Sequence, residues 1–328
     1  MIRFLLHRLL WFGLTLFCVV SVSFFLMRSV PGGPFDGERS LNPAIERNIQ
    51  ARYHLDWPEW KQFLQYIGPL NLAEDGAKIT GGDGSDTFGG VLTGDFGPSF
   101  KYRDFSVNDI IGQSLPISVS LGAIALLWAL ILGLTAGIAS ALYRNTKTDV
   151  ALRLAATTGI ALPNFVIAGF LVILFVFLIP ILPVAGYGTP QHLLLPGFAL
   201  GAPFAAYIAR LPRTGMLEVL SQDHIRTAHA KGLPPKLVLL RHAIKGGLLP
   251  VVSYLGPATA GILTGSLVIE RIFAIPGTGS HFVNSALNRD YTLSMGVTIL
   301  YTVLVYGLNT VVDLAYTFLD PRIKLEDS

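Results

Sequence analysis

The chain has 328 residues, of which 52% are apolar and only 14% are charged, and its mean hydropathy is +0.55. An average soluble domain carries about 25% charged residues, so this composition argues against a soluble protein and for an integral membrane protein. The net charge of +3 is small, and we expect membrane lipid as a partner and no nucleic acid.

Six apolar runs are candidates for membrane spans, each of which needs about 20 residues. They cover residues 9–29, 114–142, 157–182, 193–211, 247–269 and 296–319. The third run contains Pro163-Asn164, which predicts a kink. The fourth run is short and contains two prolines and two glycines, so it is the least typical of the six. The sequence therefore predicts an all-α integral membrane protein with six transmembrane helices.

The first run follows two basic residues, Arg3 and Arg8, as a signal peptide would. Its apolar stretch is longer than the 7–15 residues of a typical signal-peptide core, and no A-x-A cleavage site follows it. We interpret residues 1–29 as a retained signal-anchor helix. The lone cysteine, Cys18, lies inside this run and is expected to be a small core or lipid-facing residue.

The distribution of Lys and Arg predicts that both ends of the chain are cytoplasmic. The expected cytoplasmic segments carry many basic residues: Arg3 and Arg8, then Arg144, Lys147 and Arg153 in the 143–156 loop, seven residues of the 210–246 loop, and Arg322 and Lys324 in the tail. On the other side, the 183–192 loop has no basic residue, and the 270–295 loop has only Arg271 and Arg289.

Residues 30–113 form the one long segment outside the expected spans, and the orientation makes it extracytoplasmic. Residues 43–66 show a helical pattern of apolar positions, whereas residues 68–98 are rich in glycine. The Asp/Gly cluster at 81–86 loosely resembles a calcium loop but lacks the bidentate Glu of the EF-hand. Because the histidines are also scattered, we expect no metal site.

A polar, basic stretch, Ser221 to Pro234, lies between the fourth and fifth runs. Ser221 is a suitable N-cap, Asp223 suits the first turn, and Gly232 suits the position just past the helix end. The sequence predicts a helix of about three turns. Two interpretations are open: a surface helix that only joins two spans, or a lever that a cytoplasmic partner holds.

The residues from Arg226 to Leu233, Arg-Thr-Ala-His-Ala-Lys-Gly-Leu, with Leu248-Leu249-Pro250 after them, resemble the coupling-loop signature of binding-protein-dependent ABC permeases. Residues 31–39, 94–102, 265–270, 276–279, 286–291 and 320–322 are similar to the B-type subunit of oligopeptide permeases. The usual E-A-A triplet is replaced by Thr227-Ala228-His229, which leaves any role of His229 open. The glycine-rich residues 68–92 resemble an insertion relative to the family pattern.

The resemblance implies a permease of the type I ABC importer fold in the bacterial inner membrane. It implies a large periplasmic segment between the first two helices (30–113) and a five-helix core (114–328) with a cytoplasmic coupling loop at about 210–246. The partners would be a second, C-type permease, two ATP-binding subunits, and an extracytoplasmic peptide-binding protein that delivers oligopeptides. The sequence contains no G-x-x-x-x-G-K-[ST] P-loop, so we expect this chain not to be an ATPase. We expect no cofactor in this chain, and ATP and Mg in the partner ATPases.

The resemblance also indicates which residues do this work. The ATPase-coupling residues would be Asp223, Arg226, Thr227, Ala228, His229, Ala230, Lys231, Gly232 and Leu233. The loop facing the binding protein or the substrate would include Pro276, Gly277, Gly279, Asn288, Arg289 and Asp290, unless it is a plain connector.

Three polar residues inside the spans leave alternatives open. Asp313 could relay protons in a secondary carrier, but an ion pair with Arg153 or Arg210 is the preferred interpretation. Asn309 would join the same polar cluster, and Asn164 would line the pathway or bind the kinked backbone. A secondary carrier predicts paired broken helices in internal repeats, which the sequence does not show. A non-transporting scaffold would give the 221–232 helix no purpose.

Overall fold

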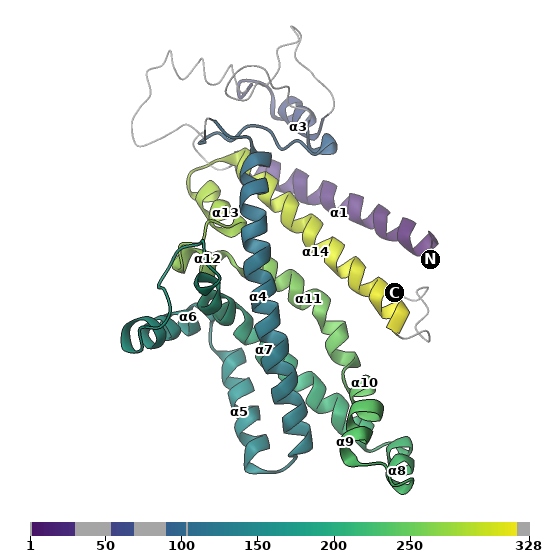
Figure 1. Ribbon diagram of the computed structural model, residues 1–328. Helices are drawn as coiled ribbons and strands as arrows, with labels where there is room; N and C mark the ends of the chain where they lie inside the picture. Colours follow the sequence, from purple (N-terminus) through teal and green to yellow (C-terminus); the bar gives the residue numbers. More distant parts are fainter. Residues whose placement is uncertain (1, 30–53, 69–89, 103, 320–328) are drawn as a thin grey trace. The chain divides into compact units, whose positions relative to one another are not determined.

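The computed structural model describes residues 2–29, 54–68, 90–102 and 104–319 (Figure 1). Its contacts divide the chain into two compact units, residues 1–117 with 276–306 and residues 118–275 with 307–328. In this division, residues 276–306 pack with the N-terminal part. The sequential division into residues 1–29, 30–113 and 114–328 stays a prediction. Motif 31–39, the first half of the helical pattern at 43–66, most of the glycine-rich stretch and the tail lie outside the described residues.

The first unit contains helices α1 (Ile2–Ser29), α3 (Glu59–Ile67) and α13 (Thr278–Leu287), the 3-10 turn η1 (Val91–Thr93), and the first parts of α4 (Val107–Leu142) and α14 (Tyr291–Leu319). Helices α1 and α14 lie side by side (Figure 1), and the Tyr306 hydroxyl donates to the Arg8 carbonyl at 2.9 Å. Phe24 of α1, Tyr66 of α3 and Met295 of α14 share a buried apolar core. This core joins α1 to the start of the last span.

The second unit is built around α7 (Gln191–Leu220), which packs against the helices on both sides of it in sequence. The other elements of this unit are the rest of α4 and α14, α5 (Lys147–Ala161), α6 (Asn164–Val172), the π-helical segments η2 (Ile173–Leu178) and η3 (Leu239–Ala243), α8 (Asp223–Ala230), α9 (Pro235–Val238), α10 (Ile244–Gly247), α11 (Leu249–Gly265) and α12 (Leu267–Ile272). Helix α7 is the most buried of the candidate spans in the described part of the chain.

Glycines let α4 and α7 approach at backbone distance. A Cβ added to Gly137 of α4 would lie 2.5 Å from the carbonyl oxygen of Ala209 in α7. A Cβ added to Gly201 of α7 would overlap the carbonyl oxygen of Ala125 in α4. Small residues that allow such contacts are the usual basis of helix packing in membranes, where lipid is as apolar as the side chains.

The third apolar run does not form a straight helix. Helix α5 ends at Ala161, and α6 begins at Asn164 after a bend of 106°. Leu162 is extended, with φ −84° and ψ 127°, as expected for a residue that precedes proline. The predicted kink at Pro163 is thus confirmed. The span predicted for 157–182 corresponds to this bent pair, but it starts earlier than predicted, because α5 begins at Lys147, inside the expected 143–156 loop.

The other spans form where the hydropathy places them, with different ends. The described chain has five helices long and apolar enough to cross a membrane, or up to six if the bent pair counts as one span. The fourth run, the least typical by sequence, is a 30-residue helix that contains three prolines. Because α7 continues to Leu220, Arg210 and Arg213 belong to this helix and not to the loop that was expected to begin at 210.

Replacing Gly201 by Leu should disrupt the contact between α4 and α7, because the added side chain meets backbone that cannot move away. We expect a loss of about 1–3 kcal/mol or more in the free energy of unfolding, measured by thermal denaturation in detergent. Gly169→Leu is the matched control, since an added Cβ at this exposed helical glycine has no neighbour within 4 Å. Equal stability of the two variants would contradict the close contact.

Candidate functional site

Helix α8 is the polar helix predicted from the sequence, but it has eight residues, about two turns instead of three. Its N-cap is Gln222, whose side chain makes no capping hydrogen bond. The predicted N-cap, Ser221, donates its hydroxyl to the Glu218 carbonyl at 2.7 Å and so ends α7 instead. The prediction for Ser221 is wrong because α7 runs on to the very start of the loop.

The C-terminal end of α8 agrees closely with the sequence prediction. Gly232 has φ +76°, a left-handed conformation that glycine adopts without strain. Its N–H donates to the His229 carbonyl at 2.9 Å, and the Leu233 N–H donates to the Ala228 carbonyl at 3.3 Å. These two bonds form a Schellman motif, which satisfies carbonyls at the helix end. Leu233 also packs against the apolar cluster under α8, a contact that often accompanies this motif.

The inner face of α8 is seated on the end of the membrane helices. Ile225 and Ala228 are 2% and 5% exposed, and they belong to one apolar cluster. The cluster also contains Ala141 of α4, Met216 and Val219 of α7, Val238 of α9, and Ala243 of η3. We call this set of seven residues the α8 seat. It holds the loop helix against both the end of α7 and the segment that leads into α11.

The outer face of α8 is open to solvent. Seven of the nine predicted coupling residues on and just after this helix are exposed: Gly232 together with Asp223, Arg226, Thr227, His229, Ala230 and Lys231. Leu233 is half-buried, and Ala228 belongs to the seat. Arg226 and Asp223 pair at 3.2 Å on this outer face, where such a pair contributes only about 0–1 kcal/mol. The two faces therefore separate attachment from any contact with a partner.

The loop after α12 contains a short helix, α13. Of the residues expected to face a binding protein or substrate, Pro276 and Asn288 are exposed and Arg289 is half-buried. Gly277 and Gly279 are buried at the start of α13. The exposed part of this loop is thus smaller than the sequence suggests.

Asp290 requires a correction, because it is 1% exposed and does not lie on an open surface. Its carboxylate accepts hydrogen bonds from the Ser99 hydroxyl, from the Phe100 N–H at 3.2 Å and from the Leu293 N–H at 3.2 Å. Asp290 therefore caps α14 and joins it to residues 99–100. The sequence pattern cannot reveal this role, because the partners lie about 190 residues away.

The three polar residues predicted inside the spans are half-buried. Asn164 starts α6 directly after Pro163, at the bend. Asn309 and Asp313 lie on the second part of α14. Arg153 contacts Asp149 at 3.4 Å. The polar cluster around Asp313 stays a prediction.

Two buried acids were missed by the sequence reasoning. Asp149 has no exposed side-chain surface and binds Arg213 through two contacts of 3.0 and 3.1 Å, joining α5 to α7. Glu270 is also fully buried, and its Oε1 accepts from the hydroxyls of Ser118 and Ser266, each at 2.7 Å. The spacing of Ser266 and Glu270 could have indicated this bond, but the predicted span ended at 269. Within the described residues, no group of three or more His, Cys, Asp or Glu side chains is placed to hold a metal ion.

Residues 129–325 match the family described as "Binding-protein-dependent transport system inner membrane component". The chain belongs to this family. The match begins inside α4 and includes α8 and all seven residues of its seat. It places the chain in the inner membrane as a component of a transport system and supports an all-α permease fold.

Similar proteins agree with this membership. The oligopeptide transport system permease protein OppB of Escherichia coli (strain K12) is 45% identical over 326 residues, covering 99% of this chain and 100% of that protein. The dipeptide transport system permease protein DppB of Bacillus subtilis (strain 168) is 42% identical over 325 residues, with 99% of each chain covered. A solved structure of inward-facing MetNI methionine ABC transporter shares the fold, with a TM-score of 0.56, 15% identity, and coverage of 64% of this chain and 96% of that one.

Replacing Ile225 by Ala should loosen α8 from its seat, because the substitution leaves a cavity in a buried cluster. We expect local destabilisation of about 2–5 kcal/mol and faster tryptic cleavage at Arg226 and Lys231 in the folded protein. The control is His224→Ala, the exposed neighbour on the same helix. Unchanged cleavage of the Ile225 variant would show that α8 is held by other contacts.

Replacing Asp290 by Ala should remove both the cap of α14 and its tie to residues 99–100. Loss of a cap alone costs about 0.5–2 kcal/mol, and the buried donors left behind add to this cost. We expect a lower melting temperature and faster tryptic cleavage at the exposed Lys101, whereas Asn288→Ala should change neither. If Asp290→Ala kept the melting temperature and the cleavage rate of the wild type, Asp290 would not be needed to hold α14 to residues 99–100.

Proposed function

We propose that this chain is the transmembrane permease subunit of an ATP-driven importer that moves oligopeptides from an extracytoplasmic binding protein into the cytoplasm. The observation that carries the proposal is the 45% identity to an oligopeptide permease protein over 326 residues, which covers 99% of this chain and 100% of that protein. The identity to a dipeptide permease protein is only slightly lower, at 42%, so peptides are the substrate class, and motif 94–102 favours the longer ones. A secondary carrier that uses Asp313 is not favoured.

Energy for transport would come from partner subunits. The sequence has no P-loop, so two separate ATP-binding subunits would hold ATP and Mg. The exposed outer face of α8 is the surface that supports docking to such a subunit, because it presents charged and polar side chains to solvent. The internal contacts of this face are local to α8: the Asp223–Arg226 pair and the bond from the Thr227 hydroxyl to the Asp223 carbonyl. The E-A-A triplet of the family pattern is absent here, so His229 would occupy a distinctive place on this face.

Movement of α8 would reach the spans through the α8 seat. Met216 and Val219 belong to the last turns of α7, and Ala243 lies just before α10 and α11. A displacement of α8 by closing ATPases would therefore act on two spans together. This arrangement supports a coupling role, since a helix attached by flexible chain alone would transmit little displacement.

On the extracytoplasmic side that the distribution of basic residues predicts, the α13 loop would meet the binding protein, and a second, C-type permease would complete the pathway. Pro276 and Asn288 are the exposed positions that support contact with a docked protein. Because the resemblance to oligopeptide permeases implies two different permeases, we expect this chain to pair with a similar subunit and not with a second copy of itself.

The experiment that tests the proposal is a pull-down of the chain, in mild detergent, from cells that contain its native neighbours. The recovered material is then assayed for ATP hydrolysis stimulated by the peptide-binding protein. We expect stimulated hydrolysis in the wild type and its loss in Gly232→Asp, where a side chain at φ +76° strains the end of α8.

Gly188→Asp is the matched control. Gly188 also has a positive φ and open space around it, but it lies in the 179–190 connection that precedes α7. A monodisperse chain that recovers no ATPase would overturn the importer proposal. Normal stimulation in the Gly232 variant would overturn the coupling role of α8 alone.

A further inference from the structure

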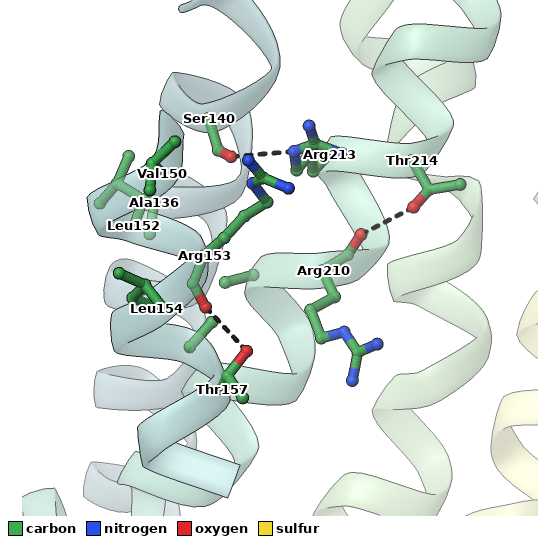
Figure 2. A pocket seen from close by; sticks show the side chains of 12 residues that line it. Ala136, Ser140, Val150, Leu152, Arg153, Leu154, Thr157, Arg210, Arg213 and Thr214 are labelled. Atoms are coloured by element: carbon green, nitrogen blue, oxygen red, sulfur yellow. Dashed lines mark hydrogen bonds between the residues drawn. The ribbon is translucent and has the colours of Figure 1, made fainter. Parts of the chain in front are cut away.

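A cavity of about 440 Å³ lies between α4, α5 and α7, entirely within the second unit. Figure 2 shows the side chains around it, with Arg153 from α5 and Arg210 and Arg213 from α7. The remaining wall is mostly apolar and comes from the same three helices. The proposed transport function does not use this cavity.

The charges around the cavity do not balance. Asp149 contacts two of the three arginines, Arg213 at 3.0 Å and Arg153 at 3.4 Å. Arg210 has no ion pair among the described residues, although its backbone carbonyl accepts from the Thr214 hydroxyl at 3.1 Å (Figure 2). Three guanidinium groups thus share one carboxylate, which leaves an excess of two positive charges and favours an anion.

The geometry of the arginines is suited to a phosphate. Arg213 is 22% exposed and is held in place by Asp149 and by the Ser140 hydroxyl, its Nε lying 3.1 Å from that oxygen. Arg153 is 52% exposed, and Arg210 is exposed as well, so both can reach a ligand. Guanidinium groups bind phosphate oxygens through pairs of parallel hydrogen bonds, which a fixed orientation strengthens.

The apolar side chains next to the arginines indicate which kind of phosphate-bearing molecule would fit the cavity. Leu154 is 63% exposed and Val150 is 44% exposed, and both line the cavity. A ligand that satisfies both features has an anionic head and an apolar tail. The combination is expected where arginines hold headgroups while neighbouring side chains contact acyl chains.

The cavity also lies at the right depth for a headgroup. It is near the start of α5 and the last three turns of α7, which lead into the 143–146 turn and α8. On the orientation that the basic residues predict, this end is cytoplasmic, and the cytoplasmic leaflet carries anionic lipids. We propose that the Arg153–Arg210–Arg213 cavity binds the phosphate headgroup of an anionic phospholipid.

The test measures lipid binding to the full chain, purified with its partner subunits in detergent and stripped of lipid. The probes are short-chain phosphatidylglycerol, phosphatidylcholine with the same acyl chains, and inorganic phosphate, with affinity measured from the thermal shift. We expect tighter binding of phosphatidylglycerol than of phosphatidylcholine and only weak binding of phosphate. Arg210→Gln should weaken phosphatidylglycerol binding about tenfold, as the loss of one charged contact implies.

Arg144→Gln is the matched control, because Arg144 is an exposed arginine on the adjoining turn and does not line the cavity. Arg210→Lys should keep much of the affinity, and Arg153→Gln repeats the test if Arg210→Gln does not fold. Equal binding of both lipids, or equal losses in the Arg144 and Arg210 variants, would overturn the site. Phosphate binding as tight as that of phosphatidylglycerol would show a soluble anion as the ligand and overturn the lipid proposal.

Discussion

The backbone contact between α4 and α7 is the constraint on which the second unit depends. Lipid tails are as apolar as the side chains, so no hydrophobic effect drives two helices together in a membrane. Their association depends on closely fitting surfaces. Here the fit is reciprocal: glycines of α4 meet Ile208 and Ala209 of α7, and Gly201 of α7 meets Ala125 of α4. Once α7 is fixed in this way, its last turns position both Arg213 and the α8 seat.

Three buried acids connect elements that lie far apart in the sequence. Asp149 joins α5 to α7, Glu270 joins α12 to α4, and Asp290 joins the start of α14 to residues 99–100. Each carboxylate has several donors around it, which compensates for removing its charge from water. Such groups fix one arrangement strongly, because losing a partner leaves a buried charge uncompensated.

Local patterns in the sequence predict the spans and the polar helix α8 well. Hydropathy locates the apolar helices, and the Gly232 end of α8 follows from a glycine after a short helical run. The missed features depend on distant residues. Nothing near Asp290 indicates that Ser99 will reach it, and Ser221 is an equally good end for either helix beside it. The length of α7 was underestimated because its prolines, which usually interrupt a helix, lie within a buried helix here.

The composition of α7 also has a consequence for how the chain enters the membrane during synthesis. This helix is less apolar than α1 and α4, contains three prolines, and has the largest share of its surface covered by other helices. Left alone in lipid, it would expose arginines and interrupted backbone hydrogen bonds. Helix α4, which packs closely against α7, would cover part of this surface, and α4 leaves the ribosome before α7.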